Sequence, residues 1–132
     1  MAKTEKRRKA ARFPADVSHA VAAAADKQAR DLVVLDLRAT GGFTDYFLIC
    51  SGSNPRQNRA IADGITEVLS AEGVKPAHVE GYDRAEWILL DYFDFIVHIF
   101  GQEPRAFYDL ERLWGNAERI AIDAPAATPT AT

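Results

Sequence analysis

Residues 87–100 read WILLDYFDFIVHIF and form the strongest structural pattern in the chain. The pattern predicts two strands joined by an acidic, aromatic turn. Apolar residues fill both faces of the second strand, which places that strand deep inside a sheet. The first strand differs, because Trp87, Asp91 and Tyr92 form a mixture that a core does not require. An aromatic anchor beside carboxylates is typical of a surface that recognises another protein.

Helices and strands alternate on either side of this hairpin. Strands are predicted over residues 32–37, 46–50 and 76–79. Helices are predicted from Pro14 to about Arg30, from Pro55 to Gly73 and from Pro104 to Gly115. This order indicates a single α/β domain with a mixed β-sheet flanked by helices.

The middle helix carries the clearest local signals. Asn54 can cap its start, Pro55 suits the first helical position and Gln57 completes a capping-box pattern. The expected apolar stripe of this helix is Ile61, Ile65, Val68 and Leu69. The side chains expected to point inward from the last helix are Phe107, Leu110 and Trp114.

Charge is distributed unevenly along the 132 residues. Residues 1–12 hold six basic groups and one acidic group, whereas the other 120 residues hold 10 basic and 18 acidic groups, a net of −8. We expect a disordered basic leader over residues 1–12, one domain over 13–120 and a disordered tail over 121–132. The leader suits a contact with RNA phosphate, and the acidic body suits a basic protein partner.

The single cysteine, Cys50, lies in the apolar run Tyr46–Cys50 and is expected to be a small buried hydrophobe. One cysteine allows no intramolecular disulfide, so a reducing compartment, the cytoplasm, is expected. No apolar run approaches the ~18 residues that a membrane span needs, so a membrane is not expected as a partner.

The sequence offers one candidate phosphate-binding loop and no candidate metal site. His19, His78 and His98 lack the spacing of a zinc site, and His98 is expected to be a hydrogen-bonded core residue. The loop Ser51-Gly52-Ser53 before a helix could hold a phosphate, as in nucleotidyltransferases, which add two carboxylates from one strand face. Asp91 and Asp94 are three residues apart and would point to opposite faces of a strand. No cofactor is therefore expected.

Several motifs resemble one known family. The stretch Asp45–Gln57, followed by residues 60–63, resembles the first half of the ribosomal silencing factor family, also called the Iojap family. Residues 80–81, 87–92, 97–100 and 105–114 resemble its second half, in the same order. One departure is Phe93, where many members have glycine. Because a bulky residue disfavours positive φ, a different type of turn is expected there.

The resemblance implies a fold related to nucleotidyltransferases but without their catalytic carboxylates, and a protein that is not an enzyme. It implies binding to the large ribosomal subunit through protein uL14, which sterically blocks joining of the two subunits. Translation is thereby repressed when nutrients are short. It also implies a homodimer when the protein is off the ribosome.

The resemblance places the partner-binding surface on one strand and the residues before it. These residues are Glu80, Tyr82, Asp83, Trp87, Leu89, Leu90, Asp91 and Tyr92. Strand alternation puts Trp87, Leu89 and Asp91 on one face of the strand. It puts Leu90 and Tyr92 on the other face, so not all five can touch one partner. The alternative function is a nucleotide-binding or nucleotidyltransferase-like enzyme that retains the loop at residues 51–53.

Overall fold

The computed structural model describes residues 13–122. The expected leader, residues 1–12, and residues 123–132 of the expected tail lie outside the described residues. In chain order the elements are α2 (Ala15–Asp26), β1 (Arg30–Asp36), β2 (Tyr46–Ser51), α3 (Pro55–Ala71), β3 (His78–Glu80), β4 (Trp87–Asp91), β5 (Phe95–Phe100), α4 (Gln102–Tyr108), α5 (Leu110–Leu113) and β6 (Glu118–Ala121).

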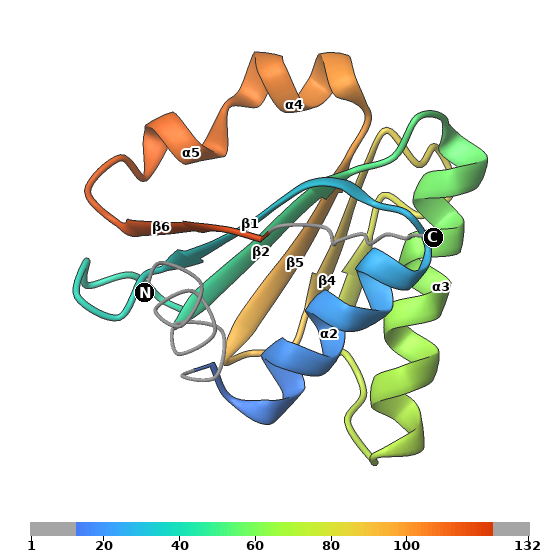
Figure 1. Ribbon diagram of the computed structural model, residues 1–132, viewed down its shortest axis with the longest axis horizontal. Coiled ribbons are helices and arrows are strands. Elements are labelled where there is room, and N and C mark those ends of the chain that lie inside the picture. The colour runs from blue at the N-terminus through green and yellow to red at the C-terminus, as the bar shows by residue number, and fades with distance from the viewer. Residues whose placement is uncertain (1–12, 123–132) are drawn as a thin grey trace, which may run out of the picture.

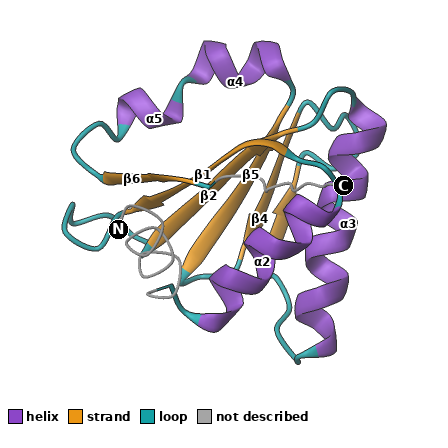
Figure 2. Ribbon diagram, in the orientation of Figure 1, coloured by secondary structure: helices purple, strands orange, loops and turns teal. Residues whose placement is uncertain are grey.

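The strands form one six-stranded sheet in the order β3-β4-β5-β2-β1-β6. β2 and β5 run parallel, whereas the other neighbouring strands are antiparallel. α2 and α3 lie on one face of the sheet, and α4 and α5 lie on the opposite side (Figures 1 and 2). The predicted α/β class, with a mixed sheet flanked by helices, is confirmed.

Each face of the sheet has its own apolar cluster. The larger cluster lies under α2 and α3, where buried alanines such as Ala20 and Ala24 let α2 approach the sheet closely. Of the stripe predicted on α3, Ile61, Ile65 and Leu69 are buried, whereas Val68 is 40% exposed and was wrongly placed in the core. The smaller cluster contains Phe47, Phe100 and Leu110.

The start of α3 has the predicted cap with one difference. Asn54 Oδ1 accepts a hydrogen bond from the Gln57 amide at 2.8 Å, and Pro55 is the first helical residue. The Gln57 side chain reaches back to the Ser53 amide at 2.7 Å, one residue further than in a standard capping box.

The last predicted helix is broken in two. Asp109, with a φ of 48°, separates α4 from α5. The side chains of α5 therefore do not continue the helical spacing of α4. Leu110 is buried as predicted, but Phe107 is 81% exposed, so its predicted inward orientation is wrong. β6 was not predicted, and it carries the sheet to Ala121, one residue beyond the expected domain boundary.

The turn between β4 and β5 also differs from the expectation. Phe93 adopts a φ of 69°, so the bulky side chain does not prevent a positive φ at this position. The Tyr92 amide donates to the Phe95 carbonyl at 2.9 Å and closes a hairpin with a two-residue loop.

Candidate protein-docking face

Four of the predicted site residues share the sheet face opposite α2 and α3. Trp87, Leu89 and Asp91 alternate with buried residues along β4. Glu80 of β3 pairs with Leu89 in the antiparallel ladder, so the two side chains lie on the same face. We call Glu80, Trp87, Leu89 and Asp91 the outer face. Three of them are half-buried, and Glu80 is exposed.

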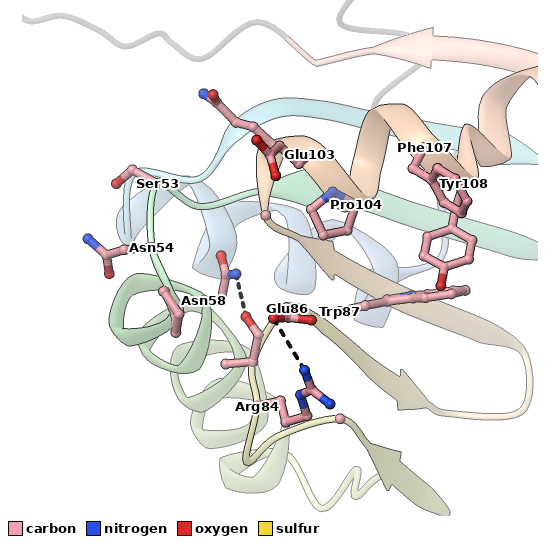
Figure 3. A pocket seen from close by; sticks show the side chains of 15 residues that line it. Ser53, Asn54, Asn58, Arg84, Glu86, Trp87, Glu103, Pro104, Phe107 and Tyr108 are labelled. Carbon is pink, nitrogen blue, oxygen red and sulfur yellow. Dashed lines mark hydrogen bonds and ion pairs between the residues drawn. The ribbon is translucent and has the colours of Figure 1, made fainter.

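The indole of Trp87 is held on three sides. Its Nε1 donates a hydrogen bond to Nδ1 of His98 at 3.0 Å. The indole stacks on Phe100 with ring centroids 4.8 Å apart, and Tyr108 lies against it at 4.5 Å. In Figure 3 the indole is seen edge-on beneath the ring of Tyr108. Trp87 is therefore fixed in one orientation while part of its surface faces solvent.

His98 supports Trp87 from beneath the outer face. It is 4% exposed, and its ring meets Phe47 edge-on with centroids 4.5 Å apart. Burial lowers the pKa of His98 from 6.5 to about 4, so the ring is neutral at pH 7. Because Nδ1 accepts from the indole, the proton of the neutral ring lies on Nε2. The prediction of a hydrogen-bonded core histidine is confirmed.

Two predicted site residues lie on the other face of β4. Leu90 is 1% exposed and Tyr92 is 7% exposed, and both belong to the cluster under α2 and α3. Burial raises the pKa of the Tyr92 hydroxyl to about 12. Neither side chain is available to a partner in this fold, so both are removed from the candidate site.

The remaining two predicted residues are tied to α3. The Tyr82 hydroxyl donates to the Asp63 carboxylate at 2.9 Å, and this hydrogen bond raises the pKa of Tyr82. The Arg59 guanidinium donates to the Asp83 carbonyl at 2.9 Å. Both residues are exposed, but they border α3 and lie outside the row of side chains along β4.

A groove adjoins Trp87. Its volume is about 930 Å³, and it lies between the start of α3, the loop before β4 and the helix α4 (Figure 3). Trp87 and Tyr108 form its aromatic end, and the exposed carboxylates Glu86 and Glu103 line it. Deep in the groove, Asn58 Nδ2 donates to the Ala85 carbonyl at 2.7 Å and ties α3 to this loop.

The Ser51-Gly52-Ser53 loop has its polar groups engaged within the protein. Ser51 Oγ accepts from the Arg105 guanidinium at 3.0 Å, and the Gly52 amide donates to the Phe100 carbonyl at 3.2 Å. Both the amide and the hydroxyl of Ser53 donate to Gln57 Oε1. A side chain at Gly52 would collide with Asn58 Oδ1. The glycine therefore meets a packing requirement, and the loop does not present a set of free donors to a phosphate.

The Asp91 carboxylate is also poorly placed to act with this loop in nucleotidyl transfer. Asp91 pairs across the sheet with Ile96, which in turn pairs with Phe47, four residues from Ser51 along β2. Four strand residues span about 13 Å, so Asp91 lies at the opposite end of the sheet from the loop. Burial raises the pKa of the Cys50 thiol to about 12, which makes it a poor nucleophile.

One pair of acidic residues two positions apart, Asp109 and Glu111, occurs at the break between α4 and α5. Glu111 is bound by Arg105 at 2.8 Å. Although burial alone would raise the pKa of Glu111, the hydrogen bond from Arg105 outweighs it and lowers the pKa. The ion pair therefore ties α5, which carries Glu111, to Arg105 of α4.

Within residues 13–122, no cluster of three or more His, Cys, Asp or Glu side chains has the arrangement of a metal site. In the same part of the chain, no helix combines the length and apolar character needed to cross a membrane.

Sequence reasoning missed the contribution of Tyr108 to the site. Residues 105–114 carry part of the family resemblance, but helical spacing predicts that Phe107, the neighbour of Tyr108, faces the sheet. Tyr108 instead packs on Trp87 and Phe100, since the break at Asp109 ends α4 immediately after it. The sequence signal for this break was Asp109 directly after the aromatic pair Phe107-Tyr108, because Asp tolerates positive φ.

Comparisons with known proteins agree on one family. The family model described as "Ribosomal silencing factor during starvation" matches residues 10–132. A Bacillus subtilis protein named ribosomal silencing factor RsfS is 40% identical over 104 residues, which cover 79% of this chain and 88% of the relative. A crystal structure of a Chromobacterium violaceum protein has a TM-score of 0.73 and 30% identity, covering 76% of this chain and 83% of that chain. A more distant mouse relative, 28% identical over 75% of this chain and 45% of its own, is named mitochondrial assembly of ribosomal large subunit protein 1.

Proposed function

Because the chain belongs to the ribosomal silencing factor family, we propose that it represses translation by binding the large ribosomal subunit through protein uL14. The bound domain blocks the joining of the small and large subunits when nutrients are limited. The outer face makes the contact. The protein acts in the cytoplasm by occupying a surface, and not by catalysing a reaction.

The observation that carries this proposal is the fixed orientation of Trp87. Hot spots of protein interfaces are enriched in tryptophan, and a side chain that is already ordered loses little conformational entropy on binding. The hydrogen bond to His98 and the contacts with Phe100 and Tyr108 supply this order before any partner arrives. The half-buried Leu89 extends the apolar centre beside the indole.

The charges around Trp87 favour a basic partner. Residues 80–94 contain five carboxylates against the single basic side chain Arg84. Glu80 and Glu86 are exposed. Arg84 lies 3.7 Å from Glu86, and the His78 ring lies 2.6 Å from Glu80. Ribosomal proteins are typically basic, because they contact RNA, and opposite charges on the two surfaces accelerate and orient docking.

The size of the domain supports a steric mechanism. A folded domain of the size of residues 13–122 has a radius of gyration of roughly 13 Å. A body of that size bound at a subunit interface keeps the two subunits apart, because their contact requires separations of a few ångströms. The proposal needs no conformational change in the protein.

The basic leader and a second copy of the chain make two further contacts. Residues 1–12, with a net charge of +5, contact rRNA phosphate. Deleting them should flatten the salt dependence of binding to the large subunit. Off the ribosome the protein forms a homodimer, which sedimentation equilibrium at several concentrations would detect.

A subunit-joining assay tests the proposed function. Purified large subunits are incubated with the protein, small subunits are added, and joined ribosomes are separated on a sucrose gradient. We expect the joined fraction to fall as the protein concentration rises. Undiminished joining with saturating protein on the large subunit would contradict the steric mechanism.

The alternative, a nucleotidyltransferase-like activity, is tested with labelled nucleotides and Mg²⁺. We expect no turnover, because the polar groups of the Ser51–Ser53 loop are engaged within the fold. Turnover that Asp91→Asn abolishes would favour the enzyme.

A further inference from the structure

The turn between β4 and β5 holds an aromatic residue in an unfavourable backbone conformation. Phe93 has a φ of 69° at the first position of a two-residue hairpin loop, where a positive φ favours glycine. Its side chain is 73% exposed, so packing of the core does not require the ring. Non-glycine residues in such conformations persist only where the surroundings fix them, and they concentrate at functional sites.

Three hydrogen bonds fix this turn. The Phe93 amide donates to Asp91 Oδ1 at 2.8 Å, and the Thr44 hydroxyl donates to the Phe93 carbonyl at 2.7 Å. The Asp45 amide donates to the Asp94 carbonyl at 3.0 Å. The turn is thereby locked to the loop that precedes β2.

That loop presents a second exposed aromatic residue. Phe43 is 76% exposed and precedes Thr44, whose hydroxyl bonds the turn. Its ring touches the edge of Phe47, with centroids 6.4 Å apart, at the margin of the apolar cluster on the outer side of the sheet. We call Phe43 and Phe93 the phenylalanine pair. Two large apolar side chains, both mostly in water, thus lie on segments that are hydrogen-bonded to each other.

The charges next to the phenylalanine pair are acidic. Asp45, Asp91 and Asp94 are the residues whose backbone or side chain holds the turn in place. The cation of the loop between β1 and β2, Arg38, donates hydrogen bonds of 3.0 and 2.8 Å to Asp36. Aromatic rings beside such carboxylates complement a basic protein surface and disfavour bare RNA.

From this arrangement we infer that the phenylalanine pair is a second anchor for the basic ribosomal protein that docks on the outer face. This inference rests on the proposed function and extends its contact surface. Trp87 and Asp91 are four residues apart on β4, about 13 Å, and Asp91 bonds the Phe93 amide directly. An interface of standard size covers ~800 Å² of each partner, a patch roughly 30 Å across. One partner can therefore cover Trp87 and the phenylalanine pair together.

Phe93→Gly separates binding from stability. Glycine accepts the positive φ, so the thermal midpoint should stay the same or rise, whereas affinity for purified large subunits should fall about fivefold or more. Phe43→Ser should lower affinity similarly. The matched control is Gln28→Gly, because Gln28 also has a positive φ, 64°, but lies at the end of α2, away from the outer face. It should leave affinity unchanged.

The outcomes distinguish this inference from the proposed function. Suppose that Trp87→Ala loses affinity but Phe93→Gly and Phe43→Ser bind large subunits like the parent. The phenylalanine pair is then not a second anchor, whereas the outer face remains the proposed docking site. If the parent does not bind large subunits or isolated uL14, the proposed function fails as well. Loss of self-association alone in Phe93→Gly would assign the pair to a second copy of the chain, and equal loss of binding to protein-free rRNA would assign it to RNA. Both results would overturn the inference.

Discussion

The indole Nε1 of Trp87 donates a hydrogen bond to Nδ1 of His98 across 3.0 Å. The two residues are diagonal neighbours on adjacent strands, since Trp87 pairs with Phe100 and Leu89 pairs with His98. The buried imidazole thus sets the orientation of the residue that we place at the centre of the docking face. The bond requires a neutral ring, because a doubly protonated imidazole has no acceptor.

Removing this acceptor should weaken binding without unfolding the domain. His98→Leu deletes the hydrogen bond to Trp87, which is worth about 1 kcal/mol. It also removes the buried Nε2 donor, which has no partner among the described residues, and this offsets part of the loss of stability. We expect a small change in the thermal midpoint and a loss of affinity for large subunits of about fivefold. Tryptophan fluorescence anisotropy should report a more mobile indole. His19→Leu, an exposed histidine bonded to Glu72, is the control.

Acid should destabilise the fold through His98. Its pKa is about 4 in the folded protein and 6.5 ordinarily, so the unfolded chain takes up a proton first as the pH falls. The free energy of unfolding therefore falls by up to about 3 kcal/mol between pH 6.5 and pH 4 because of this group. The contribution of His98 does not change further below that range. Urea titrations of the parent and of His98→Leu between pH 7 and 4 isolate the effect. Parallel curves for the two proteins would show that His98 does not cause it.

Reversing one exposed charge should slow docking. Glu80→Lys places a like charge against a basic partner and should reduce affinity about tenfold or more at low salt, mainly through the association rate. Glu67→Lys makes the same change on the exposed side of α3 and should have little effect. Stopped-flow association at several salt concentrations compares them. Equal losses in both variants would indicate a general effect of net charge and not a local docking contact.

Adding one methyl group to the loop before α3 should destabilise the domain. Gly52→Ala collides with Asn58 Oδ1, and overpacking of this kind costs about 1–3 kcal/mol. The double variant Gly52→Ala with Asn58→Ala relieves the collision but loses the hydrogen bond to Ala85, so it should recover only part of that loss. Denaturant unfolding measures both. A Gly52→Ala variant as stable as the parent would return the loop to consideration as a ligand site.

Local patterns predicted the elements that depend on local chemistry. The Asn54 cap and Pro55 fixed the start of α3, and the alternation along β4 separated Trp87 from Leu90. β6 escaped prediction because its four residues are mostly exposed and its order depends on pairing with β1. The break at Asp109 depends on one backbone angle, which helical periodicity does not reveal. The bond between Trp87 and His98 required the register of the hairpin, which the sequence suggested but did not specify.

Binding to isolated uL14 tests the central claim most directly. The parent, Trp87→Ala and Val68→Ala are compared by calorimetry, with circular dichroism to establish that each is folded. Val68 is the control because it is an exposed apolar residue on the opposite side of the sheet. Truncation of a hot-spot tryptophan costs about 2 kcal/mol or more, so Trp87→Ala should bind roughly thirtyfold more weakly while Val68→Ala binds like the parent. A folded Trp87→Ala variant that binds uL14 as tightly as the parent would contradict the assignment of the outer face as the docking site.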